Sequence, residues 1–310
     1  MSAAVCGLGL LLCGCGLQSD TGATYSGPVR LGFVNGGSSQ FNSCLQKAVV
    51  ESAGDNLARV RTANSRQSPT IELSNVKDMI AHKVNAIILM TVDASALKAD
   101  IAAAKKAGIP VVLTALLPPD GDKDILGAVL GQVAEAGKLD AQWVAQDADG
   151  ESVQAGVVFG DGSTSSDLMA GGFTKNLPHN VEVVASEPGG FNKPEANAAA
   201  ARMIQAHPDI RYVFVASEEM AFGVREALDA AGAGTVKIVT VNGSDAGLAA
   251  LKDGRFSATV SSSVKDLGDL AVTQTLSLLR KDKTQKIVYV PSRLVTKDSA
   301  DTAPLYCPSD

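Results

Sequence analysis

The sequence lacks the features that mark several common classes of protein. No apolar run reaches the ~18–20 residues that a membrane-spanning helix requires. The net charge is −6 and the pI is about 5.2, and an acidic chain offers little of the basic surface that nucleic-acid binding needs. Aromatic residues make up only 4% of a chain that is 45% hydrophobic and contains 30 glycines. This composition is typical of an Ala/Val/Leu-rich α/β protein, and 310 residues are enough for two domains.

Motifs for metal binding and catalysis are missing as well. The three histidines, His82, His179 and His207, are far apart, and none pairs with a nearby cysteine at metal-ligand spacing. No GxSxG, HExxH or other pairing of a nucleophile with a base occurs. The turn GDGST at 160–164 lacks the lysine of a P-loop and does not match GxGxxG, so a helix cap is the simpler interpretation. The sequence therefore predicts no metal, no cofactor and no catalytic activity.

The first fifteen residues have a composition of their own. Residues 3–14, AAVCGLGLLLCG, have the length of a signal-peptide core and are too short to span a membrane. Leu12-Cys13-Gly14-Cys15 looks like a bacterial lipobox, in which Cys15 would be lipidated after cleavage. No Lys or Arg occurs before Arg30, so either the true start lies upstream or the segment is only an apolar tail. We expect a lipoprotein-type signal segment at 1–15, a flexible tether at 16–28, and an extracytoplasmic protein held at the cell membrane by its lipid.

Export would leave Cys44 and Cys307 as the only thiols of the folded body. A disulfide between them would join the first helix to the C-terminal tail and close a very long loop, which contributes about 5 kcal/mol in the chain-entropy model. Two unpaired cysteines are the alternative, and the sequence leaves both open.

From residue 29 onward, strand-like and helical segments alternate. The stretch VRLGFVNGGSSQF at 29–41 runs from a strand through a glycine-serine turn into a helix that begins near Phe41. Continuous apolar runs at 86–90 and 109–113 are typical of strands buried on both faces. After a break at 118–122 the rhythm restarts, with strands expected at 153–159, 181–185, 212–216, 236–241, 256–262 and 287–290, the last followed by a tail. This pattern predicts parallel sheets with right-handed crossovers.

The two halves of the chain are similar, which predicts two Rossmann-like, doubly wound α/β lobes joined by a hinge near residues 131 and 262. We expect an N-terminal lobe from 29–131 plus 263–291, and a C-terminal lobe and tail from 132–262 plus 292–310. Two sheets that face each other across a hinge form a cleft that closes on a small ligand. Ligands bind at the carboxyl edge of parallel strands, so the turn after the first strand would form one lip of this cleft.

The order of these motifs resembles the ribose-type, or type I, periplasmic binding proteins, which share their fold with the effector domain of the lac-repressor family. The resemblance spans about residues 29–297 and lies in the order of 31–41, IPVV at 109–112, 162–173, AHPDI at 206–210, YVFVASEEMAFG at 212–223, IVTVNG at 238–243 and 256–262. Where the repressors carry a helix-turn-helix, this chain has its apolar leader and tether. The resemblance implies a monomer that captures a small polar, sugar-like solute for an ABC permease. A sensor that signals to a membrane receptor kinase is the alternative.

The family's ligand contacts fall on ten positions when they are carried over motif by motif. They are Ser38, Gln40, Phe41, Ala115, Leu116, Asp167, the stacking aromatic Phe191, and Ser217, Asn242 and Ser262 after the later strands. In sugar binders an Asp-Arg pair follows IPVV and an arginine stands at the place of Asp167, so this pocket has lost both arginines and gained an acid. An uncompensated buried Asp167 would be costly. The resemblance therefore implies a ligand with a positive charge or several hydroxyl donors, or a partly wet site, rather than an aldopentose held in the usual way.

Overall fold

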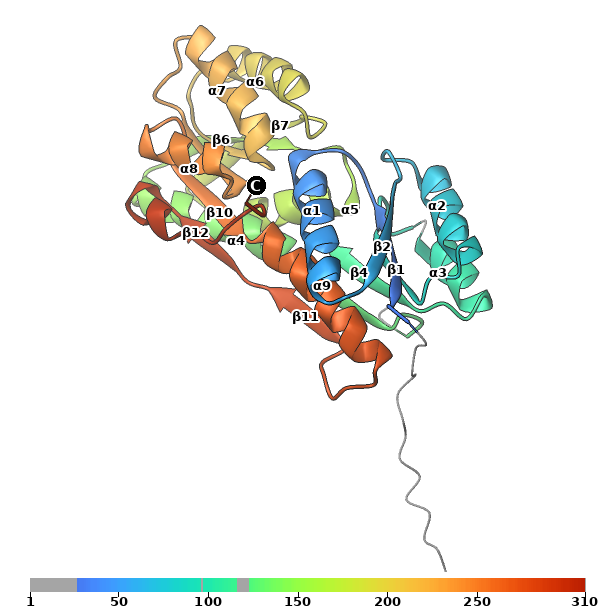
Figure 1. Ribbon diagram of the computed structural model, residues 1–310. Helices are drawn as coiled ribbons and strands as arrows, with labels where there is room; N and C mark the ends of the chain where they lie inside the picture. Colours follow the sequence, from blue (N-terminus) through green and yellow to red (C-terminus); the bar gives the residue numbers. More distant parts are fainter. Residues whose placement is uncertain (1–26, 96, 116–122, 310) are drawn as a thin grey trace, which may run out of the picture.

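The chain folds into two lobes (Figure 1). The computed structural model describes residues 27–95, 97–115 and 123–309. Each lobe contains a six-stranded sheet with helices on both faces. The predicted fold class, two doubly wound α/β lobes joined by a hinge, is confirmed. The expected signal segment with Cys15, and all but the end of the expected tether, lie outside the described residues.

The N-terminal lobe is built from ten elements. They are β1 (Arg30–Asn35), α1 (Gln40–Asp55), β2 (Arg59–Asn64), α2 (Pro69–Ala81), β3 (Ala86–Met90), α3 (Leu97–Lys106), β4 (Val111–Ala115), β5 (Gly127–Gly131), α9 (Val264–Leu279) and β11 (Ile287–Val290). The strand order is β11-β5-β4-β3-β1-β2, and every neighbouring pair is parallel. The carboxyl ends of all six strands therefore lie at one edge of the sheet.

The C-terminal lobe repeats this plan. Its elements are α4 (Val133–Ala148), β6 (Val153–Phe159), α5 (Thr164–Thr174), β7 (Val181–Pro188), α6 (Lys193–Ala206), β8 (Ile210–Val215), α7 (Glu218–Ala230), β9 (Lys237–Asn242), α8 (Asp245–Lys252), β10 (Ala258–Ser262), β12 (Ser292–Val295) and the 3-10 helix η1 (Lys297–Thr302). The strand order is β12-β10-β9-β8-β6-β7, with β12 antiparallel to β10 and the other pairs parallel.

Three connections cross between the lobes at the carboxyl ends of strands. Gly131 and Gln132 join β5 to α4, Ser262 and Ser263 join β10 to α9, and Pro291 joins β11 to β12.

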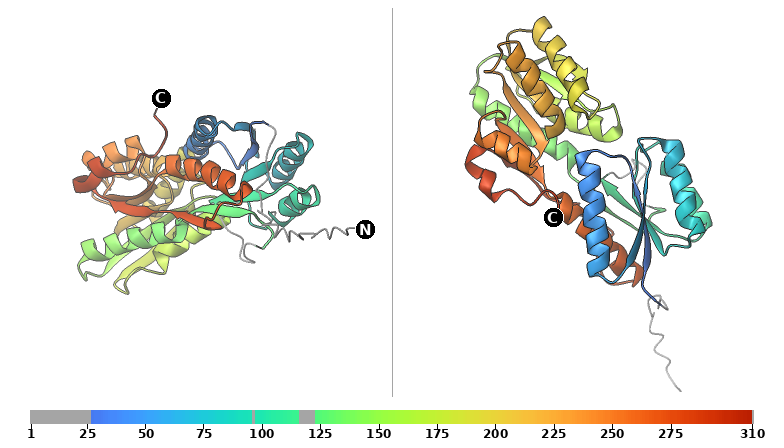
Figure 2. Two further views of the ribbon diagram at one scale, coloured as in Figure 1. Left: turned by 60° about the horizontal axis from the view of Figure 1, so that its bottom comes forward. Right: turned by 45° about the horizontal axis from the view of Figure 1, so that its top comes forward.

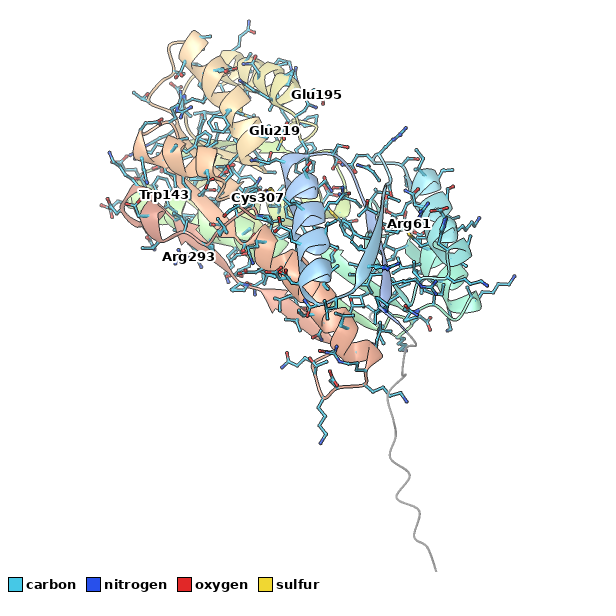
Figure 3. The ribbon with its side chains drawn as sticks, viewed as in Figure 1. Arg61, Trp143, Glu195, Glu219, Arg293 and Cys307 are labelled. Atoms are coloured by element: carbon cyan, nitrogen blue, oxygen red, sulfur yellow. A yellow bond between two sulfur atoms is a disulfide. The ribbon has the colours of Figure 1, made fainter. Side chains whose placement is uncertain are left out.

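The C-terminal tail makes a further connection. η1 packs against α8 and β12 in the C-terminal lobe, but the residues after it return to the N-terminal lobe. Ser263 Oγ donates to Leu305 O at 2.7 Å, and Lys265 N donates to Tyr306 O at 3.0 Å. A disulfide joins Cys307 to Cys44 on α1, and the chain ends at the junction of the lobes (Figures 2 and 3). Of the two alternatives for these cysteines, the structure has the disulfide.

β12 and η1 were not expected from the sequence, and both lie in the segment after 287–290 that was expected to be a tail. The antiparallel direction of β12 has a simple cause. β10 runs toward the hinge and leaves its sheet there, whereas β12 enters the same sheet from the hinge, so the two neighbours must point in opposite directions.

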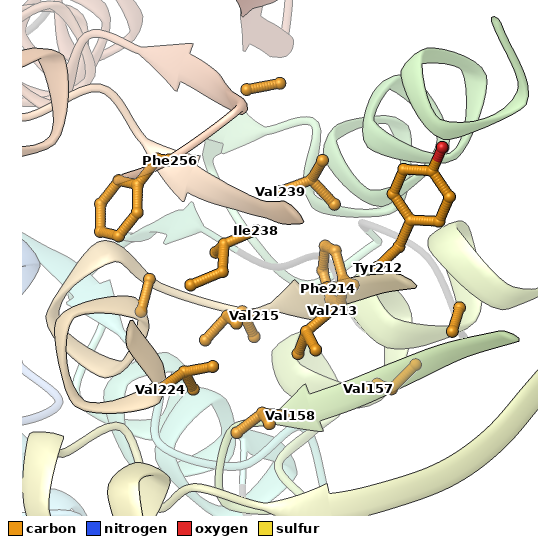
Figure 4. Close-up of a cluster of buried hydrophobic side chains, with 14 of the residues drawn as sticks. Val157, Val158, Tyr212, Val213, Phe214, Val215, Val224, Ile238, Val239 and Phe256 are labelled. Carbon is orange, nitrogen blue, oxygen red and sulfur yellow. The ribbon is translucent and has the colours of Figure 1, made fainter. Parts of the chain in front are cut away.

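Alternating strand residues pack into different helix layers, as a pleated strand requires. In the N-terminal lobe Phe33 and Ile88 pack with α1 and α9, whereas Val34 and Ile87 pack with α2 and α3. Figure 4 shows the core of the C-terminal lobe around Phe214 of β8. These buried faces make each sheet a rigid base for the loops at its carboxyl edge.

In the C-terminal lobe, α4 and α5 approach closely at Gly137 and Gly172. A Cβ at either glycine would overlap the backbone of the other helix. On the sheet side of the pair, the ring of Phe173 stacks on that of Phe214 with centroids 4.7 Å apart. The helix that follows the first crossing is therefore fixed tightly to the body of its lobe.

Candidate functional site

A cavity of about 180 Å³ lies between the two lobes. Its walls come from the loops that follow β1, β2 and β3 in one lobe and β6 to β10 in the other, and residues of the three crossings line it as well. This is the carboxyl edge of both sheets, where open α/β folds bind their ligands.

The lining combines apolar surface with uncharged polar groups. Phe41 and Phe191 contribute half-buried aromatic rings. The side chains of Gln40, Gln67, Asn242 and Ser262 also line the cavity, and none of them has a hydrogen bond within the part of the chain that the structure describes. These amides and hydroxyls are therefore free to bind a ligand.

Charge in the lining is of one sign. Asp161 and Glu219 are its charged residues, and no described lysine or arginine belongs to it. Glu219 stands at the start of α7, where Figure 3 labels it. A cavity with carboxylates and without a cationic side chain disfavours anionic ligands, because like charges repel one another and nothing of opposite charge offsets the repulsion.

The wall from the N-terminal lobe is fixed by its own amides. Ser39 is the N-cap of α1 and its Oγ accepts from Asn42 N at 3.3 Å. Asn42 Nδ2 donates to Asn35 Oδ1, and Asn35 Nδ2 donates to Asn42 O, both at 2.9 Å. These bonds tie the end of β1 to the first turn of α1 and so position Gln40 and Phe41.

A buried glutamate braces the loop after β3. Glu72 on α2 accepts from Thr91 Oγ1 and from Val92 N, each at 2.7 Å. Burial raises the pKa of Glu72, and its hydrogen bonds oppose that shift only in part. Burial and the charge of the neighbouring Glu72 raise the pKa of Asp100 on α3 to about 8. At neutral pH Asp100 is therefore mainly protonated.

The C-terminal lobe has a stronger brace of the same kind. Glu218 on α7 accepts from Gly243 N at 2.9 Å, Ser244 N at 2.8 Å and Thr259 Oγ1 at 2.7 Å, and also from Ser244 Oγ. Gly247 leaves the room for it, since a Cβ there would overlap the carboxylate. The braced loop begins directly after Asn242, so Glu218 fixes the position of that cavity residue from behind.

Both Glu218 and its neighbour Asp140 on α4 are buried carboxyl groups. Burial raises the pKa of Glu218, although its four hydrogen bonds lower it. Burial and the charge of Glu218 raise the pKa of Asp140, whose oxygens have no hydrogen-bond partner among the described residues. The C-terminal lobe therefore holds a second buried carboxyl group, Asp140, close to a carboxylate whose four acceptor positions are already used.

Three cavity residues have a left-handed backbone that is unusual outside glycine. The φ angles are 58° at Gln67, 51° at Phe191 and 147° at Asn242. Such conformations cost free energy, persist only where the surroundings impose them, and gather at ligand sites. The backbone of both lobes is thus held in a particular form where the side chains face the cavity.

Six of the ten contacts expected from the resemblance line the cavity: Gln40, Phe41, Phe191, Ser217, Asn242 and Ser262. Ser38 does not; it is exposed, and its Oγ accepts from Asn64 Nδ2 at 3.0 Å. Ala115 ends β4, and Leu116 lies outside the described residues. Whether these ten residues contact a ligand stays a prediction.

The expected burial of Asp167 is wrong. Asp167 is exposed on α5 and does not line the cavity. In the same turn Ser165 lines the cavity, and Ser166 is buried and accepts from Gly160 N at 2.9 Å. One residue further along a helix turns the side chain by about 100°, so Asp167 points to solvent and no buried charge needs compensation.

Several lining residues were not expected from the sequence, among them Gln67, Gln132, Glu219 and Tyr306. Gln67 follows β2 and could have been found by inspecting the residues after every strand. Glu219 could not be separated from Glu218 without knowing which faces inward. Tyr306 reaches the cavity on the tail, and nothing in its local sequence signals that.

Metal and membrane-spanning features are not found in the described ranges. Within them no three His, Cys, Asp or Glu residues gather in a way that could hold a metal ion. The helices of the same ranges are too short or too polar to cross a bilayer.

Comparison with known proteins agrees with this geometry. The sequence profile of the periplasmic binding protein domain matches residues 32–283. The ribose import binding protein of Bacillus subtilis is 26% identical over 254 residues, which cover 82% of each chain. The xylitol-binding protein of Mycolicibacterium smegmatis is 28% identical over 310 residues, covering 97% of this chain and 86% of the relative.

Solved structures share the fold over most of their length. The arabinose-binding component of an ABC transporter from a Shewanella species, bound to arabinofuranose, has a TM-score of 0.82 and 26% identity, covering 88% of this chain and 94% of its own. A solute-binding protein from Bacillus halodurans with bound myo-inositol has a TM-score of 0.84 and 22% identity. The match covers 90% of this chain and 98% of that protein. The chain therefore belongs to the periplasmic binding protein family, with the type I fold of the sugar-binding proteins of ABC importers, and its relatives are binding proteins rather than enzymes.

Proposed function

We propose that this protein captures a small, uncharged polyhydroxylated ligand, a sugar or a sugar alcohol, in the cavity between its lobes and delivers it to an ABC importer. The observation that carries the proposal is the set of unpaired amide and hydroxyl groups in the lining, beside the rings of Phe41 and Phe191. Hydroxyl groups both donate and accept, so they satisfy amides directly, and the apolar face of a sugar suits an aromatic ring. The names of the relatives, which include ribose- and xylitol-binding proteins, support this class of ligand.

The negative charge of the cavity lining restricts the class of ligand further. Asp161 and Glu219 accept from hydroxyl or ammonium donors and repel anions, and no described cation offsets them. A sugar acid or a sugar phosphate would bury its charge without a partner, which costs several kcal/mol or more.

Binding would close the lobes on one another about their crossings. The two bodies that move are 29–131 with 263–291 and 132–262 with 292–310, the latter carrying the tail that returns to α1. The disulfide between Cys44 and Cys307 fits an oxidising, extracytoplasmic location. A lipid on Cys15 would then hold the protein at the membrane, near its permease.

Isothermal titration against a mixed panel tests the proposal. Ribose, arabinose, xylitol and myo-inositol form the neutral set, and gluconate and ribose 5-phosphate form the acidic set. We expect at least one neutral compound to bind with micromolar or tighter affinity and neither acid to bind. Preference for an acid, or absence of binding by every neutral compound, would overturn the proposal.

A further inference from the structure

The tail carries a tyrosine into the cavity. Tyr306 lines the cavity but belongs to neither set of strand-end loops that form the walls. It is only 3% exposed and packs with Val264 and Leu267 of α9. Its position therefore depends on how the tail is held.

Three contacts hold the tail around Tyr306. Its own carbonyl accepts from Lys265 N at 3.0 Å, and the carbonyl before it accepts from Ser263 Oγ at 2.7 Å. The next residue, Cys307, is bound covalently to α1. A residue between a pair of main-chain contacts and a disulfide has little freedom to move, which suits a preorganised binding group.

The hydroxyl of Tyr306 is buried without a hydrogen bond. No described residue is a partner of its Oη. Burial, together with the charges of Glu218 and Glu219, raises the pKa of Tyr306, so the phenol stays protonated and remains a donor over the physiological range. An unpaired buried hydroxyl costs about 1–3 kcal/mol, and proteins keep few such groups without a purpose.

We propose that Tyr306 is a ligand-binding residue that the disulfide-anchored tail places in the cavity, and that its hydroxyl donates a hydrogen bond to a hydroxyl of the bound ligand. The inference rests on the proposed function, because it needs a ligand with hydroxyl groups. In this proposal the C-terminal tail supplies a ligand contact in addition to those of the strand-end loops. The disulfide then has the role of positioning that contact.

Tyr306→Phe is the direct test, because it removes one oxygen and keeps the ring. The probe is the tightest-binding neutral compound of the panel above, measured by isothermal titration. We expect the affinity to fall roughly three- to tenfold, as for loss of one hydrogen bond. The melting temperature without ligand should stay the same or rise, because the hydroxyl has no partner to lose. Tyr289→Phe is the matched control, since Tyr289 on β11 is 54% exposed, and it should change neither value.

Removing the bridge tests the positioning role. We expect Cys44→Ala with Cys307→Ala to weaken binding at least as much as Tyr306→Phe. Adding Tyr306→Phe to this double variant should cause little further loss, because the hydroxyl is then already displaced. Full affinity without the bridge would overturn the positioning role of the disulfide.

The outcomes separate this inference from the function on which it rests. If wild-type protein binds a neutral compound and Tyr306→Phe binds it equally well, the inference alone is wrong. If Tyr306→Phe lowers affinity and ligand-free melting temperature together, Tyr306 is a packing residue and the inference is again wrong. If wild-type protein binds no compound of the panel, the proposed function fails and the inference fails with it.

Discussion

The two lobes have the same topology but prepare their sides of the cavity differently. In the N-terminal lobe the side-chain amides of Asn35 and Asn42 form hydrogen bonds between these two residues, and these bonds fix the loop between β1 and α1. In the C-terminal lobe Glu218 fixes the loop from behind with four hydrogen bonds, and the amide of Asn242 is left without a partner. A loop that is braced from behind keeps its cavity side chain available. We therefore expect the C-terminal lobe to provide the more selective polar contacts.

The braces themselves give the largest expected effect. Glu218→Ala leaves two backbone donors and two hydroxyls without their acceptor, so we expect it to lower the free energy of unfolding by about 4 kcal/mol. Glu72→Ala removes only two such bonds and should cost about 2 kcal/mol. Urea denaturation followed by circular dichroism measures both.

Glu226→Ala is the control for the braces. Among the described residues Glu226 makes an exposed ion pair with Lys193, so its loss should change the free energy of unfolding by well under about 1 kcal/mol. If Glu218→Ala and Glu72→Ala lowered the free energy of unfolding equally, the two lobes would be braced equally well. That result would contradict the stronger brace expected in the C-terminal lobe.

The pH dependence of stability gives the second effect. Asp100 in the native state has a pKa of about 8, whereas in the unfolded chain it ionises near pH 4. Between these values the native state binds the extra proton, so its contribution is fully present below about pH 4 and is lost as pH rises toward 8. Between pH 5 and pH 7.5 we expect the free energy of unfolding of the wild-type protein to fall by roughly 1–3 kcal/mol more than that of Asp100→Asn, because an asparagine side chain does not titrate.

Urea titrations at several pH values between 5 and 8 measure this difference. Asp124→Asn serves as the control, since Asp124 lies on the surface in an ion pair with Lys105. A wild-type slope that Asp100→Asn leaves unchanged would show that Asp100 is already ionised in the native state.

The third effect concerns ligand affinity in the C-terminal lobe. Asn242→Gly removes the amide and, unlike alanine, accepts the φ of 147° without strain. We expect the affinity for the tightest neutral compound of the panel to fall about tenfold or more, as for loss of paired hydrogen bonds to a buried group. The melting temperature without ligand should hardly change. Unchanged affinity in titration would remove Asn242 from the site.

The smallest effect is expected from the matching change in the other lobe. Gln67 also lines the cavity with a left-handed backbone, at φ 58°, but Gln67 is exposed to solvent. Water competes for an exposed amide, so Gln67→Gly should weaken binding by only about threefold or less. A larger loss in Gln67→Gly than in Asn242→Gly, in the same titration, would reverse the order of the two lobes.

Much of the fold could be predicted because its signals are local. The apolar runs at Ala86–Met90 and Val153–Phe159 are strands with the expected bounds. β12 could not be predicted in the same way, because four residues with two polar members become a strand only beside β10. Pairing along a sheet edge depends on where the chain re-enters the lobe, and this cannot be predicted from a short sequence pattern.

The site could be predicted only in part, for reasons of geometry. Positions directly after strands, such as Ser217 and Asn242, reach the cavity because the topology places every strand end there. The expected burial of Asp167 was wrong because Asp167 lies inside a helix, where a shift of one residue separates a buried side chain from an exposed one. Tyr306 depends on a bridge that joins positions 263 residues apart, and the sequence left that bridge open.

The most direct test of the whole account is a crystal structure of the protein with the tightest-binding neutral compound of the panel. We predict that the compound lies between the rings of Phe41 and Phe191, with hydroxyl groups bonded to the Asn242 amide. A compound bound outside the space between the lobes, or bound there without touching Asn242, would contradict the account.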